Sequence, residues 1–138
     1  MIVVDTNVVA YLLIHGQHTA AARATFARDP EWAAPLLWRS EFRNLLAVYL
    51  RRHDLSLQQA LSLQEAAESL VVGREHAAAS NEVLALVNDS GRSASDCEFI
   101  AVARRLGVPF VTSDRQLLAS FPKDAVALQT FGVDVADD

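Results

Sequence analysis

The sequence predicts an α/β protein in which a parallel sheet carries helices on both faces. The chain opens with a short apolar run, Ile2–Val4, which passes into a helical stretch without Gly or Pro, as a buried strand followed by a helix does. Apolar runs and helical patterns then alternate along the chain, which is the order typical of parallel strands. The 138 residues suit one domain with one core, and we expect a single domain over 1–138.

The first half of the chain is expected to form two strands and four helices. In order, these are a strand over 2–4, a helix from Asp5 to about Leu13, a helix over about 18–28, a strand over 31–35, a helix from Pro35 to about His53, and a helix over about 56–69. Pro30 stops the second helix, because the residue before a proline avoids helical geometry. Ser56 is a good N-cap for the fourth.

The second half is expected to complete the sheet. In order, the elements are a strand over 70–72, a helix over 75–88, a helix opened by Ser93 or Ser95 and running to about Leu106, a strand over 110–112, a short helix from Ser113–Asp114, and a strand over 125–128. Gly107 follows the long helix, as glycine often does at a helix C-terminus. The acidic tail 134–138 is expected to be frayed.

Composition limits the functional classes. No apolar run approaches the ~18 residues that cross a membrane, no basic segment precedes the first apolar run, and Cys97 has no partner for an internal disulfide. We therefore expect a cytoplasmic protein. The net charge of −5 gives no overall basic field for nucleic acid, unless the acids are gathered in one place and neutralised by a metal.

Two acids follow predicted strands. Asp5 ends the first strand, and Asp114 lies just past Thr112. Ligands in parallel sheets bind beyond the carboxyl ends of the strands, so an acid there indicates a cation site. The alternative for each is an ordinary helix N-cap, by Asp5 or Thr6 in the first case and by Asp114 in the second.

Two further acids belong to helices. Glu41 shares a face with the apolar stripe of Trp38 and Leu45, where a lone carboxylate is costly unless it is paired, protonated or metal-bound. The alternative places its head in water at the edge of the stripe. Asp96 lies in a first helical turn and matches a capping box with Ser93, so its functional interpretation depends on the other three acids.

Together these four acids are expected to converge on one side of the sheet. Clustered carboxylates raise one another's pKa unless a cation lies between them. Oxygen ligands without His or Cys favour Mg²⁺ or Mn²⁺. Such ions orient a water and stabilise charge on a phosphoryl group, so the pattern indicates phosphodiester hydrolysis.

Over its full length the chain resembles PIN-domain ribonucleases of the VapC toxin type, from bacterial toxin–antitoxin pairs. The matching residues are Val3–Asn7, Glu41, Ser95–Asp96 with 99–103, and Thr112–Asp114 with Leu117–Leu118. The resemblance implies a three-layer α/β/α fold with about five parallel strands. It also implies cleavage of RNA with Mg²⁺ or Mn²⁺, a homodimer, and inhibition by a small antitoxin protein.

The resemblance also assigns residues. It implies that the metal-binding and catalytic acids are Asp5, Glu41, Asp96 and Asp114, and that the supporting residues are Thr6, Asn7, Thr112 and Ser113. Arg115 would stand at the rim of the pocket and touch RNA, although a solvated surface role is the simpler interpretation. The alternative function is a catalytically silent PIN-like domain that docks a basic partner in the acidic pocket.

Overall fold

Five parallel strands form the centre of the molecule in the order β3-β2-β1-β4-β5. The strands are β1 (Ile2–Val4), β2 (Trp32–Pro35), β3 (Glu75–His76), β4 (Phe110–Thr112) and β5 (Ala125–Ala127). The computed structural model describes residues 1–133, and the tail 134–138, for which fraying was expected, lies outside the described residues. The five-stranded parallel sheet confirms the predicted fold class.

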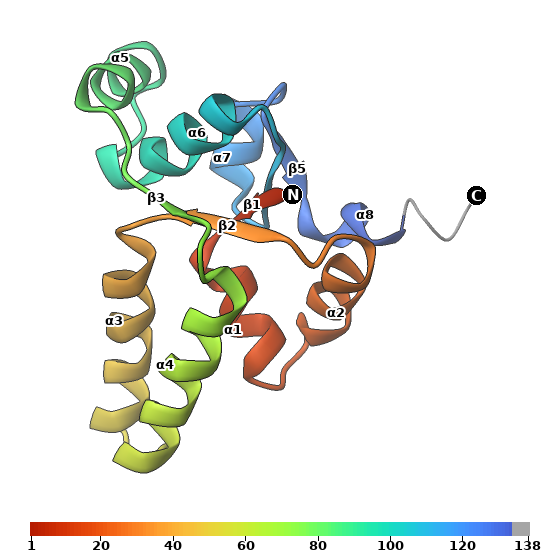
Figure 1. Ribbon diagram of the computed structural model, residues 1–138, viewed down its shortest axis with the longest axis vertical. Helices are drawn as coiled ribbons and strands as arrows, with labels where there is room; N and C mark the ends of the chain where they lie inside the picture. Colours follow the sequence, from red (N-terminus) through yellow and green to blue (C-terminus); the bar gives the residue numbers. More distant parts are fainter. Residues whose placement is uncertain (134–138) are drawn as a thin grey trace.

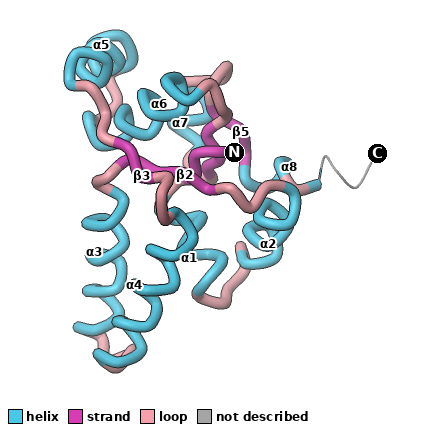
Figure 2. Tube along the Cα trace, viewed as in Figure 1, coloured by secondary structure: helices cyan, strands magenta, loops and turns pink. Residues whose placement is uncertain are grey.

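Helices cover the sheet on both sides (Figure 1). They are α1 (Thr6–Leu13), α2 (Thr19–Arg28), α3 (Trp38–Arg51), α4 (Leu57–Val71), α5 (Ser80–Ser90), α6 (Ala94–Leu106), α7 (Arg115–Ser120) and α8 (Leu128–Phe131). Figure 2 shows α5 and α6 on one side of the strands, and α1, α3 and α4 on the other. Within residues 1–133, no helix is both long and apolar enough to cross a membrane.

The central strands are short but fully buried. The three residues of β1 are at most 1% exposed, and Phe110 and Val111 of β4 are 0% exposed. Strands enclosed on both faces need continuous apolar runs rather than alternation, which is why three residues sufficed to predict each of them. Val3 pairs with Ala33 on one side and Phe110 on the other, so β1 lies in the middle of the core.

The structure corrects three predicted boundaries around the third strand. The predicted strand at 70–72 is wrong, because Val71 completes the buried face of α4 and the edge strand is Glu75–His76. The helix expected from Glu75 begins only at Ser80. Pro35 ends β2 instead of opening a helix, and α3 begins at Trp38. A short apolar run has no periodicity that separates a strand from the end of a buried helix.

Predicted caps are mostly confirmed. Ser56 and Gln59 form a reciprocal capping box at α4, and Ser93 rather than Ser95 caps α6. Gly107 ends α6 with φ 68°, a left-handed conformation that glycine adopts without steric cost. The last strand stops at Ala127, since the next residue already belongs to α8.

Edge strand β3 is held by a polar network that the sequence did not reveal. Glu75 accepts hydrogen bonds from the indole of Trp38 at 2.7 Å and from the Arg39 guanidinium at 2.7 Å, while Arg39 also reaches Glu68 on α4 at 2.9 Å. The hydrogen bonds from Arg39 hold the pKa of Glu75 below its ordinary value. The network ties α3 and α4 to the edge of the sheet.

Candidate active site

Asp5 and Asp114 lie beyond the carboxyl ends of neighbouring parallel strands. Val4 pairs with Val111 in the sheet, and the backbone amide of Asp5 donates to the carbonyl of Val111 at 3.0 Å. Asp114 follows two residues after β4 ends. Parallel pairing of β1 with β4 therefore brings these two acids to one edge, although more than a hundred residues separate them in the chain.

One buried hydroxyl links the two acidic loops, which are the segment after β1 that carries Asp5 and the segment after β4 that carries Asp114. Thr112, the last residue of β4, is 0% exposed. Its Oγ1 donates to Asp5 Oδ2 at 2.7 Å and accepts from the backbone amide of Asp114 at 3.0 Å. The carboxylate of Asp5 is thereby oriented through one of its two oxygens.

Glu41 joins the same region from α3. Thr6, in the first turn of α1, donates its hydroxyl hydrogen to Glu41 Oε1 at 2.7 Å. The following turns of α3 bury Phe42 and Leu46, so packing of the helix fixes the direction of Glu41. Arg39 is engaged with Glu75, which leaves Glu41 without that guanidinium as a partner.

The capping alternatives have different outcomes at Asp5, Asp96 and Asp114. Asp114 is a helix cap, because its Oδ1 accepts from the backbone amides of Gln116 at 2.9 Å and Leu117 at 3.1 Å. Asp5 occupies the N-cap position of α1, but its carboxylate makes no capping bond. At α6 the cap is Ser93, which accepts from the amide of Asp96, so the Asp96 carboxylate stays outside that motif.

The four acids influence one another electrostatically. Burial raises the pKa of Asp5, and the charges of Asp114 and Asp96 raise it further against the opposing hydrogen bond from Thr112. Burial also raises the pKa of Glu41, with additional contributions from Asp5, Asp96 and Glu98. We call Asp5, Glu41, Asp96 and Asp114 the acid cluster.

The acid cluster has the donor chemistry of a site for a hard divalent cation. Its candidate ligands are all carboxylate oxygens, and a cation would offset the burial and the smaller charge repulsion that raise the pKa values of Asp5 and Glu41. In residues 1–133, no three His, Cys, Asp or Glu side chains are already arranged closely enough to hold a metal ion. The metal role of these acids stays a prediction.

The expected supporting residues separate into two groups. Thr6 and Thr112 hydrogen-bond to acids of the cluster. Asn7 is exposed in the first turn of α1, and the Ser113 Oγ lies 3.5 Å from the Tyr11 hydroxyl rather than against a carboxylate. Arg115 is exposed at the first residue of α7, and its contact with RNA stays a prediction.

Sequence reasoning missed two charged residues near the cluster. Glu98 adds negative charge near Glu41. Arg92 donates to Gln116 at 2.8 Å and so joins the start of α6 to the start of α7. Its Nε is buried without a partner among the described residues. No local motif marks either residue.

Comparison with known proteins identifies the family. The sequence pattern of the PIN domain matches residues 2–122, and no curated protein matches the chain. The crystal structure of PAE2754 from Pyrobaculum aerophilum is similar, with a TM-score of 0.77 and 23% identity over 99% of this chain and 97% of that chain. At this identity the likeness bears on the fold alone. Because the family pattern covers most of its length, the chain belongs to the PIN domain family.

Proposed function

We propose that the protein is an endoribonuclease that hydrolyses RNA phosphodiester bonds at the acid cluster with Mg²⁺ or Mn²⁺. PIN domains are usually nucleases and generally use divalent metal ions. The observation that carries the proposal is that burial raises the pKa values of Asp5 and Glu41, and that the charge of Asp96 raises both further, together with Asp114 at Asp5 and Asp5 at Glu41.

The residues of the cluster have distinct roles in this proposal. Activation of a water and stabilisation of phosphoryl charge are the chemistry that a divalent cation supplies. Thr112 and Thr6 each donate to one oxygen of an acid, so the carboxylates of Asp5 and Glu41, oriented by these hydroxyls, would hold the cation. Asp114 is fixed by its helix cap, and Asp96 adds a carboxylate from the first turn of α6.

Cleavage of total cellular RNA tests this proposal. The purified protein is incubated with Mg²⁺ or Mn²⁺, with EDTA, and as the variant Asp5→Asn. The introduced amide keeps an oxygen that can accept from Thr112, and the Asp5 carboxylate makes no capping bond, so the variant is expected to fold. Glu65→Gln, on the exposed face of α4, is the matched control.

A few discrete fragments that require both metal and Asp5 are the expected result. Equal cleavage by Asp5→Asn and by Glu65→Gln would remove Asp5 from the mechanism. Metal binding without cleavage of any RNA would favour the binding domain that docks a basic partner in the acid cluster.

We further propose a VapC-like cytoplasmic toxin that forms a homodimer and is inhibited by a small antitoxin. This finer assignment is supported by the motifs at Val3–Asn7 and Thr112–Asp114. Growth arrest on expression, relieved by the product of a neighbouring small gene, is the expected result, and light scattering is expected to give the mass of a dimer. A monomer that leaves growth unchanged would contradict the toxin assignment but not the nuclease.

A further inference from the structure

A separate pocket beside the acid cluster has the chemistry of a nucleobase site. It is a cavity of about 310 Å³ between α1, the turn after it, and α3, at the small end of the ~300–1,000 Å³ range of ligand pockets. Its lining residues are Asn7, Ala10, Tyr11, Ile14, His15, Gly16, Gln17, His18, Thr19, Leu45 and Tyr49. We call this cavity the aromatic pocket.

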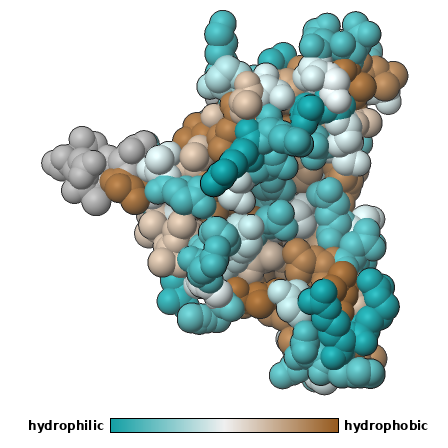
Figure 3. Space-filling model, turned by 180° about the vertical axis from the view of Figure 1, so that it is seen from behind, coloured by the Kyte–Doolittle hydropathy of each residue, from teal (hydrophilic) through white to brown (hydrophobic). Residues whose placement is uncertain are grey.

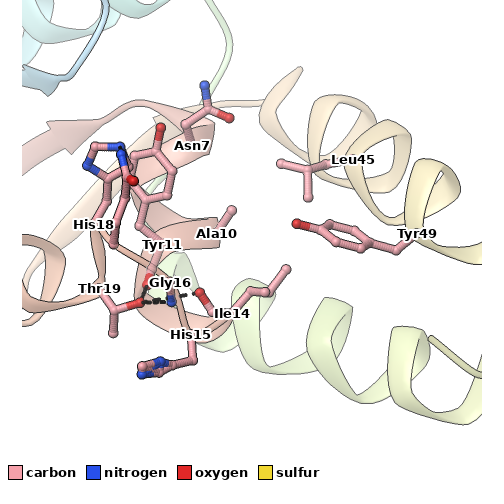
Figure 4. A pocket seen from close by; sticks show the side chains of 11 residues that line it. Asn7, Ala10, Tyr11, Ile14, His15, Gly16, His18, Thr19, Leu45 and Tyr49 are labelled. Carbon is pink, nitrogen blue, oxygen red and sulfur yellow. Dashed lines mark hydrogen bonds between the residues drawn. The ribbon is translucent and has the colours of Figure 1, made fainter. Parts of the chain in front are cut away.

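Aromatic rings stand on both walls of the aromatic pocket. Tyr11 of α1 and His18 of the turn lie with their ring centroids 4.5 Å apart. Figure 4 shows Leu45 and Tyr49 pointing from α3 toward α1, with the Tyr49 hydroxyl directed into the space between the helices. Unpaired bases stack on such rings. None of the described lining residues is Asp, Glu, Lys or Arg, which favours an uncharged planar ligand over a phosphate.

Hydrogen bonds of the buried Thr19 hydroxyl hold the turn that carries His15 and His18. Thr19 is 4% exposed, and its hydroxyl donates to the Tyr11 carbonyl at 2.8 Å and accepts from the Gly16 amide at 2.9 Å. These bonds, drawn in Figure 4, hold the turn against the end of α1. The pocket is therefore formed before any ligand arrives, which lowers the cost of ordering on binding.

Two elements that line the aromatic pocket also lead to residues of the acid cluster. On α1, Asn7 lies two residues after Asp5, and the Tyr11 hydroxyl lies 3.5 Å from the Oγ of Ser113. On α3, Leu45 and Tyr49 follow Glu41 by one and two turns on the same face, roughly 6 and 12 Å along the axis. Both elements therefore lead from the acids to the pocket within about two helical turns.

The half of the molecule that holds the pocket carries hydrophobic as well as hydrophilic side chains on its surface. Figure 3 shows, from behind, hydrophobic side chains between hydrophilic ones in the lower half of the molecule, where Figure 1 places α1, α3 and α4. The lining combines apolar side chains, those of Ala10, Ile14 and Leu45, with polar groups that include Asn7 and the two tyrosine hydroxyls, as small-ligand sites do.

We propose that the aromatic pocket binds the base of the unpaired nucleotide next to the scissile phosphate, stacking it between Tyr49 on α3 and the Tyr11–His18 pair. The inference rests on the proposed ribonuclease function, because it assigns that enzyme a single-stranded substrate. Stacking tolerates every base, so the amide of Asn7 is the group that selects among bases through their hydrogen-bonding edges.

Metal-free titration with adenosine, cytidine, guanosine and uridine tests the inference apart from cleavage. The chain has four histidines, of which His15 and His18 line the pocket while His53 and His76 do not. The proton NMR signals of the four histidine imidazole rings are followed during the titration, and single His→Ala variants assign each signal to its residue. At least one nucleoside is expected to shift the signals of His15 and His18 and leave the other two unchanged.

Variants at Tyr49 supply the matched control. Loss of a stacked base costs about 1–3 kcal/mol, so Tyr49→Ala is expected to weaken nucleoside binding about 5- to 150-fold. Tyr49→Phe keeps the ring that stacks and loses only the hydroxyl, so it is expected to lose less affinity than Tyr49→Ala. In the cleavage assay Tyr49→Ala is expected to raise KM more than it lowers kcat.

Three results would overturn the inference: no shift with any nucleoside, equal shifts of all four histidines, or unchanged binding by Tyr49→Ala. Each would leave the pocket to a partner that is not a nucleic acid. If one of these results is found but the protein still cleaves RNA, the proposed ribonuclease function stands and only the nucleobase site is refuted. Selective nucleoside binding without RNA cleavage would preserve the pocket and refute the nuclease.

Discussion

Replacing Thr112 by Val removes the hydroxyl that joins the two acidic loops while keeping the shape of the side chain. The variant loses the bond to Asp5 Oδ2 and the bond from the Asp114 amide, at a position that is 0% exposed. A hydrogen bond to a charged group contributes about 1.5–3 kcal/mol and an ordinary one about 0.5–1.5 kcal/mol. We expect the variant to lose roughly 2–4 kcal/mol of unfolding free energy.

This loss is measurable as a melting temperature. Unfolding entropies near 2.1 cal/mol/K per residue give about 0.29 kcal/mol/K for this chain, so the expected decrease is about 7–14 °C. The direction in which the stability difference changes with pH also follows from the structure. The Thr112 bond lowers the pKa of Asp5, so its loss raises that pKa further, and the stability difference from the parent protein is expected to grow as the pH rises through it.

Thr25→Val is the matched control, because Thr25 is also 0% exposed but its hydroxyl only donates to the Ala21 carbonyl of its own helix, at 2.9 Å. Its effect is expected to be small and independent of pH. Thermal unfolding of both variants by circular dichroism, without added metal and over the acidic to neutral range, separates them. If Thr112→Val melts no lower than Thr25→Val at any pH, the structural link between the loops is refuted.

Two further predictions test other parts of the structure. Glu75→Gln is expected to lower the melting temperature near neutral pH. Because Arg39 lowers the pKa of Glu75, the stabilisation by the Glu75 carboxylate is complete above the ordinary carboxyl pKa. It disappears as the pH falls through the lowered pKa of Glu75. A melting-temperature difference between variant and parent that is as large in acid as at neutral pH would contradict the ion pair. Gly132→Ala is expected to cost about 1–3 kcal/mol, because a Cβ there would lie 2.5 Å from that of Ala24. Gly16→Ala is the control, because no atom lies within 4 Å of its added Cβ. Its midpoint of urea denaturation should be near that of the parent protein. Equal midpoints for the two glycine variants would refute the close packing of α8 on α2.

The order of strands and acids along the chain was enough to predict that Asp5 and Asp114 lie at the same edge of the sheet. A strand that is buried on both faces must be apolar throughout, so β1 and β4 were recognisable from three residues each. Their carboxyl ends meet because parallel neighbours end at the same edge. That reasoning placed Asp5 and Asp114 together without knowledge of the register.

Other features depend on tertiary contacts that leave no local pattern. Edge strand β3 has two half-buried polar residues, Glu75 and His76, so neither apolar alternation nor a continuous run marks it. The hydrogen bond from Thr6 to Glu41 requires α1 to cross α3. Arg92, in the loop before α6, donates to Gln116 of α7 across 24 positions in the chain. Each arises only when helices pack at a particular angle.

Binding of Mn²⁺ measured by calorimetry tests the central claim, that the acid cluster is a site for a hard divalent cation. The parent protein and Glu65→Gln are expected to bind Mn²⁺ equally, whereas Asp5→Asn and Glu41→Gln are expected to lose most of the affinity while retaining the far-ultraviolet spectrum of the fold. If all four proteins bind Mn²⁺ alike, or if none binds it, the acids are not a metal site and the proposed mechanism is contradicted.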